Sequence, residues 1–457
     1  MKYYLNIKTI LLAIIEKKLP PTFAARTLFI YNSTIMVGLK TLLDIKLIDN
    51  YNYKNTYPKI SCDKDFIDNL IRYLSLYIFE LLNRDIKSKQ ISEFIESTSS
   101  ELKKNKNYNY FLLENAQLIS LINEDVSYYY NLRNKDGWTN SNVIIPLNNE
   151  AVINVKLPID MNQMQQPNQW CPLKGQKMLG AKWGKVKGLF NSEEINNYLL
   201  KKFKKVDIKT EAKEVLDISL SLTIEEKAIA EFWAGIGGSV TPPGFFNMFL
   251  YGYFVANKKD NLTQVEYFYK LNCGLFEASI ICWNAKYECL QCRPIQSIRI
   301  NYPDIPIDYY FGKTTTTLWI PYQEKRLYTP PFPDFISGHS TFSSTASTIL
   351  TNLLGSELEK LNIELTKEEF IMLSPIFKNM EKSKMKINQI IIPKNSSQII
   401  ENTPSEQITL KFSTWKSMAE SAGISRIYGG IHYPSSNKLA LKVGKCIGKK
   451  IIGLSKY

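Results

Sequence analysis

The stretch PFPDFISGHSTFSS, residues 331–344, is the part of the sequence on which the fold assignment depends most. A proline-rich loop leads through Ser-Gly-His into small and apolar residues that predict a packed helix over 339–355. Ser337 and Gly338 precede this helix, where a hydroxyl, an accessible backbone amide and the helix dipole favour an anion. The segment also holds His339, one of two histidines in 457 residues. Taken alone, it is equally an ordinary N-cap followed by a packed histidine.

The second histidine lies in SRIYGGIHYPSSN, residues 425–437. Arg426 supplies a planar, permanently charged guanidinium that suits a tetrahedral oxyanion. Two glycines between Arg426 and His432 allow the backbone to pass close to a ligand. This segment, too, could by itself be a structural turn.

A third segment, CWNAKYECLQCRP (282–294), carries two cations among apolar residues. We expect one long helix over 263–293, stopped by Pro294. In such a helix Lys286 and Arg293, seven residues apart, project from one face. A buried helix does not carry two cations without an anion to meet them, which argues against a pair of solvated charges.

Together the three segments predict a pocket for a phosphate-like anion. Three basic side chains can balance up to three negative charges, and Ser337 and the Gly338 amide can donate neutral hydrogen bonds. Of the two imidazoles, one can bond to the central atom of the anion and the other can move a proton. The basic residues are Lys286, Arg293 and Arg426.

In this order, K-x6-R-P, P-x3-SGH and SR-x5-H resemble the signature of the vanadium-dependent haloperoxidase and type 2 phosphatidic acid phosphatase superfamily. The segments KWGKVKGLF (182–190) and EFWAGIGGSVTPPG (231–244) resemble the soluble haloperoxidase-like branch. The resemblance covers about residues 5–450 of the chain, although only the three motifs are highly specific.

The resemblance implies a role for each motif residue. His432 would bond to vanadium, or attack phosphorus in a phosphatase, and His339 would be the acid–base group. The Lys286 ammonium would polarise a bound peroxo group. Trp283 and Phe332 match aromatic positions beside the halide site, although ordinary core packing explains them equally well. The groups implied to hold the oxygens of the anion are Lys286, Arg293, Ser337, Gly338 and Arg426.

The function implied is that of a vanadate-dependent haloperoxidase-like oxidoreductase, which oxidises a halide with hydrogen peroxide. The alternative is a soluble, acid-phosphatase-like phosphomonoesterase, which would use the same pocket and a histidine nucleophile on a phosphate ester. A third reading is a non-catalytic helical protein that retains the pocket. The motifs do not separate the first two readings, because vanadate and phosphate share charge and shape. The preferred halide, the organic acceptor and the oligomeric state are not predicted.

Helical spacing dominates the rest of the chain. Apolar residues recur every four positions over 66–83, and Thr223 with Glu226 predicts a capping box. The class is therefore mostly α, and the resemblance implies an all-α fold of two four-helix-bundle-like halves in one compact unit.

We expect the N-terminal helical half to span 1–215 and the C-terminal half, with the oxyanion site, to span 216–457. Residues 366–408 are rich in Lys, Glu and Asn and predict a surface excursion.

Composition indicates a globular protein, with 44% hydrophobic and 22% charged residues. No apolar run reaches the ~18 residues of a membrane span. The first apolar stretch (10–15) is short and is followed by Glu and two Lys, so it predicts an amphipathic helix ended near Pro20 rather than a signal peptide. Seven cysteines without framework spacing suit a reduced, intracellular protein, and the Cys289-x-x-Cys292 pair lacks further ligands nearby.

The net charge of +14, from 57 basic and 43 acidic side chains, is the remaining compositional signal. Because lysine is spread along the whole chain, we interpret the charge as a solvated basic surface that helps to attract anions. No nucleic-acid partner is expected.

Overall fold

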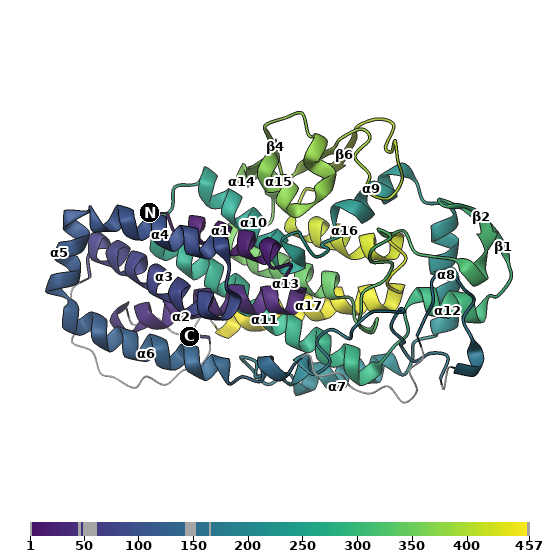
Figure 1. Cartoon of the computed structure of the whole chain (residues 1–457), viewed down its shortest axis with the longest axis horizontal. Helices are drawn as coiled ribbons and strands as arrows, with labels where there is room; N and C mark the ends of the chain where they lie inside the picture. Colours follow the sequence, from purple (N-terminus) through teal and green to yellow (C-terminus); the bar gives the residue numbers. More distant parts are fainter. Residues whose placement is uncertain (1, 44–46, 49–61, 142–151, 164–165, 455–457) are drawn as a thin grey trace.

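The computed structural model describes residues 2–43, 47–48, 62–141, 152–163 and 166–454. Over this part of the chain it is an elongated assembly of helices (Figure 1). Seventeen α-helices and three two-stranded antiparallel sheets occur in the described residues, which confirms the predicted all-α class. The division at residue 215 stays a prediction.

The helices of the first half of the chain are α1 (Tyr4–Glu16), α2 (Pro21–Leu43), α3 (Lys64–Ile86), α4 (Lys89–Lys103), α5 (Lys106–Glu114), α6 (Ala116–Asn134), α7 (Glu193–Phe203) and α8 (Ile208–Leu220). The later helices are α9 (Ile224–Phe232), α10 (Thr241–Ala256), α11 (Asn261–Cys289), α12 (Pro294–Asn301), α13 (Gly338–Leu354), α14 (Leu358–Leu361), α15 (Lys367–Leu373), α16 (Trp415–Tyr428) and α17 (Pro434–Leu454). The strand pairs are β1 (Pro306–Tyr309) with β2 (Gly312–Thr315), β3 (Glu364–Thr366) with β4 (Lys384–Lys386), and β5 (Gln389–Ile392) with β6 (Ile408–Lys411).

The centre of the molecule is α11, which α2, α13 and α17 accompany along its length (Figure 1). Most of α11 is buried on every side, as expected of a helix that is apolar all round. Phe29 of α2 stacks on Phe276 of α11 with ring centroids 4.3 Å apart. The last turn of this buried helix brings Lys286 into the interior of the molecule.

Helices α13 and α17 pack unusually closely because both present small residues to each other. A Cβ atom on Gly444 would lie 2.6 Å from the Thr341 carbonyl oxygen, and one on Gly448 would lie 2.7 Å from Thr348 Cβ. Ser344 Oγ donates to the Leu441 carbonyl oxygen across the same interface, at 2.6 Å. The Ser/Thr-rich sequence after His339 therefore serves this close helix contact, which fixes the N-terminus of α13 at the site.

Substituting Gly444→Val is expected to lower the free energy of unfolding by about 1–3 kcal/mol, because the added methyl groups overpack a backbone contact. The matched control is Gly453→Ala in the same helix, where a Cβ meets nothing within 4 Å and alanine should be neutral or stabilising. Denaturant unfolding of both variants checks this. Equal stabilities would contradict the close packing.

Several local predictions are confirmed. Helix α3 contains the predicted 66–83 stripe, and Thr223 with Glu226 forms a capping box at the start of α9. The first helix ends at Glu16, and Pro21 begins the second. Helix α13 ends at Leu354, one residue before the predicted end, and its C-cap Gly355 has a φ of 89°.

The predicted single helix over 263–293 is wrong at its C-terminal end. Helix α11 stops at Cys289, and Leu290 adopts a left-handed conformation with φ 47°. Arg293 has extended backbone and is the N-cap of α12, because a residue before proline disfavours the helical region. Lys286 and Arg293 therefore do not share a helix face. They come from two successive helices, and the non-helical residues 290–292 lie between them in the chain.

The predicted excursion over residues 366–408 lies at the edge of the bundle in Figure 1, but it is more than surface loop. It contains α15, β4 and β5, and it buries apolar side chains such as Phe370, Phe377 and Ile390 completely. The lysines and asparagines between them hide this apolar pattern in the sequence.

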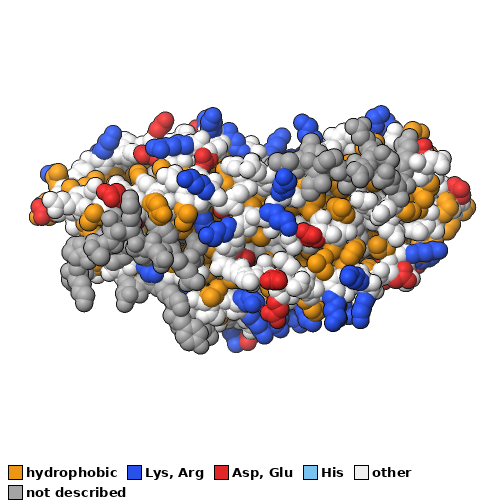
Figure 2. All heavy atoms as spheres, turned by 90° about the horizontal axis from the view of Figure 1, so that it is seen from below, with side chains coloured by type: hydrophobic (Ala, Val, Ile, Leu, Met, Phe, Trp, Pro, Cys, Tyr) orange, Lys and Arg blue, Asp and Glu red, His pale blue; other side chains and the backbone are white. Residues whose placement is uncertain are grey.

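The distribution of charged side chains on the surface agrees with the predicted dispersed basic charge. On the face shown in Figure 2, basic side chains are spread along the molecule with acidic and apolar ones between them. Among the described residues, no helix has the length and apolarity required to cross a membrane.

Candidate functional site

A cavity of about 230 Å³ lies where the three predicted segments meet. Six of the nine predicted site residues line it: Trp283, Phe332, Gly338, His339, Arg426 and His432. The other three, Lys286, Arg293 and Ser337, lie directly behind this lining and are completely or almost completely buried. The structure therefore brings all nine residues to one place, from α11, α12, the N-terminus of α13, α16 and the loop after it.

His432 is buried and is held by a carboxylate. Its Nδ1 lies 2.7 Å from Asp334 Oδ1, and Ser436 Oγ lies 3.4 Å from the same nitrogen. Burial, followed by the nearby charges of Arg293 and Lys286, lowers the pKa of His432 well below its ordinary value. The imidazole is therefore neutral at pH 7, as a ligand or a nucleophile must be.

Asp334, which the sequence motifs did not single out, lies against His432 at the site. It is completely buried, and burial raises the pKa of its carboxyl to about 6, although Arg293 and Lys286 oppose the shift. A signal was available in the PFPDF stretch, where a lone acid stands among proline and aromatic residues directly before Ser-Gly-His. An acid in such surroundings needs a cationic or imidazole partner.

Arg293 links this carboxylate to the loop around it. Its Nη1 lies 3.7 Å from Asp334 Oδ1 and donates to the Ile431 carbonyl oxygen at 2.6 Å, while Nε donates to the Phe332 carbonyl oxygen. Nη1 also lies 3.3 Å from Nε2 of His432. Burial lowers the pKa of Arg293 to about 10, so the guanidinium keeps its charge at neutral pH.

Lys286 holds the loop that precedes Ser337. Its Nζ donates to the carbonyl oxygens of Pro333 (3.1 Å), Asp334 (2.8 Å) and Ile336 (2.6 Å), which uses all three ammonium protons. Burial lowers the pKa of Lys286 to about 8. In this structure Lys286 therefore acts on the cavity through its charge and through the loop.

Anion binding is expected to weaken as the pH rises through about 8, because Lys286 then loses its proton and the site loses one positive charge. A bound anion favours the protonated ammonium, so the dissociation constant should rise by up to about tenfold per pH unit above this value. Titration with inorganic phosphate between about pH 7.5 and 8.5, below the pKa of about 9 to which burial lowers Arg426, checks this. A dissociation constant that stays flat across this range would remove Lys286 from the anion site.

His339 presents an unpaired nitrogen. Its Nε2 is buried and has no hydrogen-bond partner among the described residues. Burial, together with the charge of Arg426, lowers the pKa of His339 well below its ordinary value, while hydrogen bonds to the backbone of Ala234 and Trp233 oppose this. Gly235, at φ 57°, passes so close that a Cβ atom there would lie 3.1 Å from Nε2.

The helix N-terminus and the second arginine complete the polar side of the cavity. Ser337 is the N-cap of α13, and its Oγ accepts from the Ser340 amide at 3.4 Å. Arg426 Nη2 donates to the Ala230 carbonyl oxygen at 2.7 Å, and burial lowers the pKa of Arg426 to about 9. With Lys286 and Arg293 this gives three buried cations against the one carboxylate of Asp334.

The opposite wall of the cavity is apolar. Trp283 and Phe332 lie 4.9 Å apart between ring centroids, tilted by 50°, and the Trp283 indole donates to the Leu179 carbonyl oxygen. Both rings face the Lys286 ammonium, at 5.8 and 5.1 Å. The two predicted aromatic residues therefore line the cavity and separate it from the buried Lys286 ammonium.

The site matches a known domain type. A family model described as the VCPO second helical-bundle domain matches residues 266–456, which contain all three motifs. Residues 266–456 therefore resemble this domain of the vanadium haloperoxidase type. No curated protein matches the chain.

Crystal structures of haloperoxidases of this superfamily share the fold of the whole chain. The first bacterial vanadium-dependent iodoperoxidase superposes with a TM-score of 0.65 at 19% identity, over 98% of this chain and 95% of that chain. The holo form of a bacterial vanadium-dependent chloroperoxidase gives a TM-score of 0.65 at 15% identity, over 96% and 93%. Its apo form gives 0.63 at 15% identity, over 96% and 95%. At these identities the likeness establishes the fold.

The residues present fit the oxyanion for which this superfamily is named. Two buried nitrogens, Arg293 Nη2 and His339 Nε2, have no hydrogen-bond partner in the part of the chain that the structure describes. Unsatisfied buried donors are costly, and an anion in the cavity could accept from the guanidinium. His432 lines the same cavity, and its Nε2, which Asp334 does not contact, lies 3.3 Å from Arg293 Nη1.

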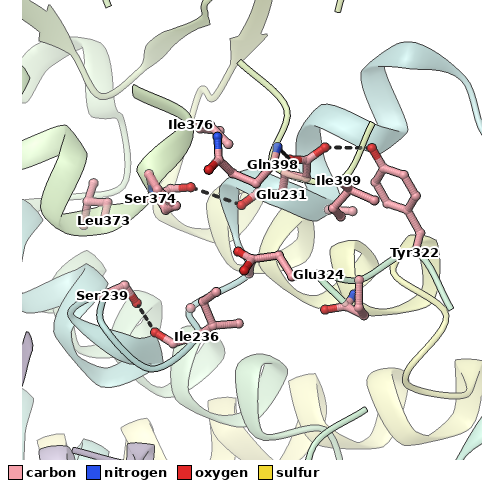
Figure 3. A pocket seen from close by; sticks show the side chains of 15 residues that line it. Glu231, Ile236, Ser239, Tyr322, Glu324, Leu373, Ser374, Ile376, Gln398 and Ile399 are labelled. Atoms are coloured by element: carbon pink, nitrogen blue, oxygen red, sulfur yellow. Dashed lines mark hydrogen bonds between the residues drawn. The ribbon is translucent and has the colours of Figure 1, made fainter. Parts of the chain in front are cut away.

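A second, smaller pocket lies beyond the 234–236 loop and shares this loop with the main cavity (Figure 3). Its polar centre is the buried Glu231 carboxylate, which accepts from Tyr322 Oη (2.7 Å), Ser397 Oγ (2.6 Å) and the Gln398 amide (2.7 Å). Burial raises the pKa of Glu231. The carboxylate is fully paired and ties the 366–408 excursion to α9, so we interpret it as structural.

Proposed function

We propose that the protein is a vanadate-dependent haloperoxidase-like enzyme, which oxidises a halide with hydrogen peroxide. The observation that carries the proposal is the pair of imidazoles that line one cavity, with the three buried cations Lys286, Arg293 and Arg426 around them. Buried cations are costly without compensating negative charge, and one carboxylate among three cations leaves room for a bound anion. The match of residues 266–456 to the VCPO second helical-bundle domain and the fold shared with two vanadium-dependent haloperoxidases support this reading.

In this reading His432 Nε2 would hold vanadate, and Arg293, Arg426, Ser337 and the Gly338 amide would hold its oxygens. Bound vanadate would supply Lewis-acid activation of hydrogen peroxide without a change in its own oxidation state. His339 Nε2, which is neutral and unpaired, would accept a proton from hydrogen peroxide. The charge of Lys286, 5.1 Å from the Phe332 ring, would stabilise negative charge that develops on this side of the cavity.

The second candidate is a phosphomonoesterase, with which the Asp334–His432 contact is equally compatible. The Asp334 contact on Nδ1 leaves Nε2 of His432 as a nucleophile that needs no cofactor. Nε2 would form a bond to phosphorus as the bond to the leaving alcohol breaks. The alcohol oxygen would take up a proton that neutral His339 relays from the monoprotonated phosphate ester or from solvent. Water would then release phosphate from His432.

Assays of the purified protein separate the readings. Oxidation of iodide, bromide and chloride by hydrogen peroxide is measured before and after addition of orthovanadate, alongside hydrolysis of a chromogenic phosphate ester. Oxidation that depends on vanadate is the expected result. Hydrolysis without vanadate, inhibited when vanadate is added, would replace it with the phosphatase reading. Neither activity would indicate a non-catalytic protein.

A further inference from the structure

A purely structural role does not explain why a carboxylate, Asp334, occupies this position. It is completely buried, within a loop whose neighbours are proline, aromatic and aliphatic residues. Only one of its oxygens is used, because Oδ2 is buried without a hydrogen-bond partner among the described residues. A half-satisfied buried carboxylate costs free energy, so its remaining contacts should have a function.

The main chain and the side chain of Asp334 are both held in place, in part by the cations of the site. Lys286 Nζ donates to its carbonyl oxygen at 2.8 Å, and its amide donates to the Gln291 carbonyl oxygen at 3.0 Å. Arg293 Nη1 lies 3.7 Å from Oδ1, and this permanent charge favours the ionised carboxylate. The side chain therefore has little freedom, and its Oδ1 is directed at His432.

The contact between Oδ1 and His432 determines which ring nitrogen carries the proton. A carboxylate only accepts, so at 2.7 Å Nδ1 must be the donor. In a neutral imidazole the other nitrogen, Nε2, then has the free electron pair. The alternative tautomer would place the lone pair of Nδ1 against the carboxylate and a proton on the nitrogen that must bond to the anion.

We propose that Asp334 is a positioning residue, which holds His432 as the Nδ1–H tautomer with the Nε2 electron pair turned to the oxyanion. The role given to Nε2, which is to bond to vanadate or to attack phosphorus, depends on the proposed function being correct. The tautomer and the ring orientation of His432 do not depend on the proposed function. Such a contact behind a ligating or nucleophilic histidine typically contributes about 10- to 100-fold to affinity or activity.

The tautomer can be observed directly because the chain has only two histidines. Protein labelled with 15N-histidine should give two imidazole patterns, and His339→Gln assigns them. In the wild type we expect His432 to show a protonated Nδ1 and an unprotonated Nε2. With Asp334→Ala, the His432 pattern should change to that of exchanging tautomers, while the His339 pattern stays. A wild-type His432 protonated at Nε2, or a pattern unchanged by Asp334→Ala, would overturn the proposal.

The matched control is Asp136→Asn, which removes another buried carboxylate, 3.3 Å from Arg26, outside the site. This variant should lose stability and leave the His432 pattern unchanged. If Asp334→Ala does not fold, Asp334→Asn keeps the shape and removes the charge. It should lower kcat, or the affinity for orthovanadate, by about 10- to 100-fold with little change in KM. An Asp334→Asn variant that matches the wild type in both quantities would overturn the proposal.

The two proposals fail separately. If neither halide oxidation nor ester hydrolysis is found, the proposed function fails, but the tautomer measurement still tests Asp334. If activity is found and the tautomer does not depend on Asp334, only the inference about Asp334 fails.

Discussion

Replacing His432 by alanine should lower turnover by about 1,000-fold or more, because in the proposed function its Nε2 bonds to the central atom of the anion. Affinity for orthovanadate should fall with it. Stability should fall by about 1–3 kcal/mol, because the substitution leaves the buried Asp334 carboxylate without its imidazole partner. Turnover assays, equilibrium dialysis with orthovanadate and denaturant unfolding measure the three effects.

The matched comparison is His339→Ala. If His339 moves a proton and does not bond to the anion, this variant should lose turnover and keep orthovanadate affinity within about tenfold of the wild type. Equal losses of affinity in the two variants would contradict the division of roles between the two histidines. A His432→Ala variant that loses stability alone would identify a non-catalytic protein.

Replacing Lys286 by methionine is expected to have the second largest effect. Three carbonyl oxygens of the 333–336 loop lose their donor, and the site loses one of its three cations. Relief from burying an ammonium offsets part of this cost, so we expect a net destabilisation of about 3 kcal/mol. Activity should fall by at least about 100-fold.

The control for Lys286 is Lys445→Met on the exposed side of α17, which changes the same charge without a buried contact. It should leave both stability and activity within error of the wild type. A Lys286→Met protein with wild-type stability would show that the ammonium does not hold the loop in solution.

The local helices and the nine motif residues of the site, though not Asp334, were predictable from the sequence, because each signal lies in residues close together in the chain. The small-residue run after His339, the capping box at Thr223 and the helix over 66–83 all have periodic or short-range signals. The two histidines stand out for a different reason, since a chain with only two places both in glycine- and serine-rich segments.

The rest depends on contacts between distant parts of the chain. Leu290 adopts a left-handed conformation, which leucine rarely does. The end of α11 before Arg293 was therefore not predictable from the sequence. The Asp334–His432 contact joins residues 98 positions apart. The anchoring of the 366–408 excursion by Glu231 likewise requires the fold to be known.

The most direct test is a crystal structure of the protein soaked with orthovanadate. The account predicts one vanadium atom bonded to Nε2 of His432, with its oxygens near Arg293, Arg426 and the N-terminus of α13. A cavity that stays empty at saturating orthovanadate, or vanadate bound only elsewhere on the basic surface, would contradict the claim that these three segments form one oxyanion site.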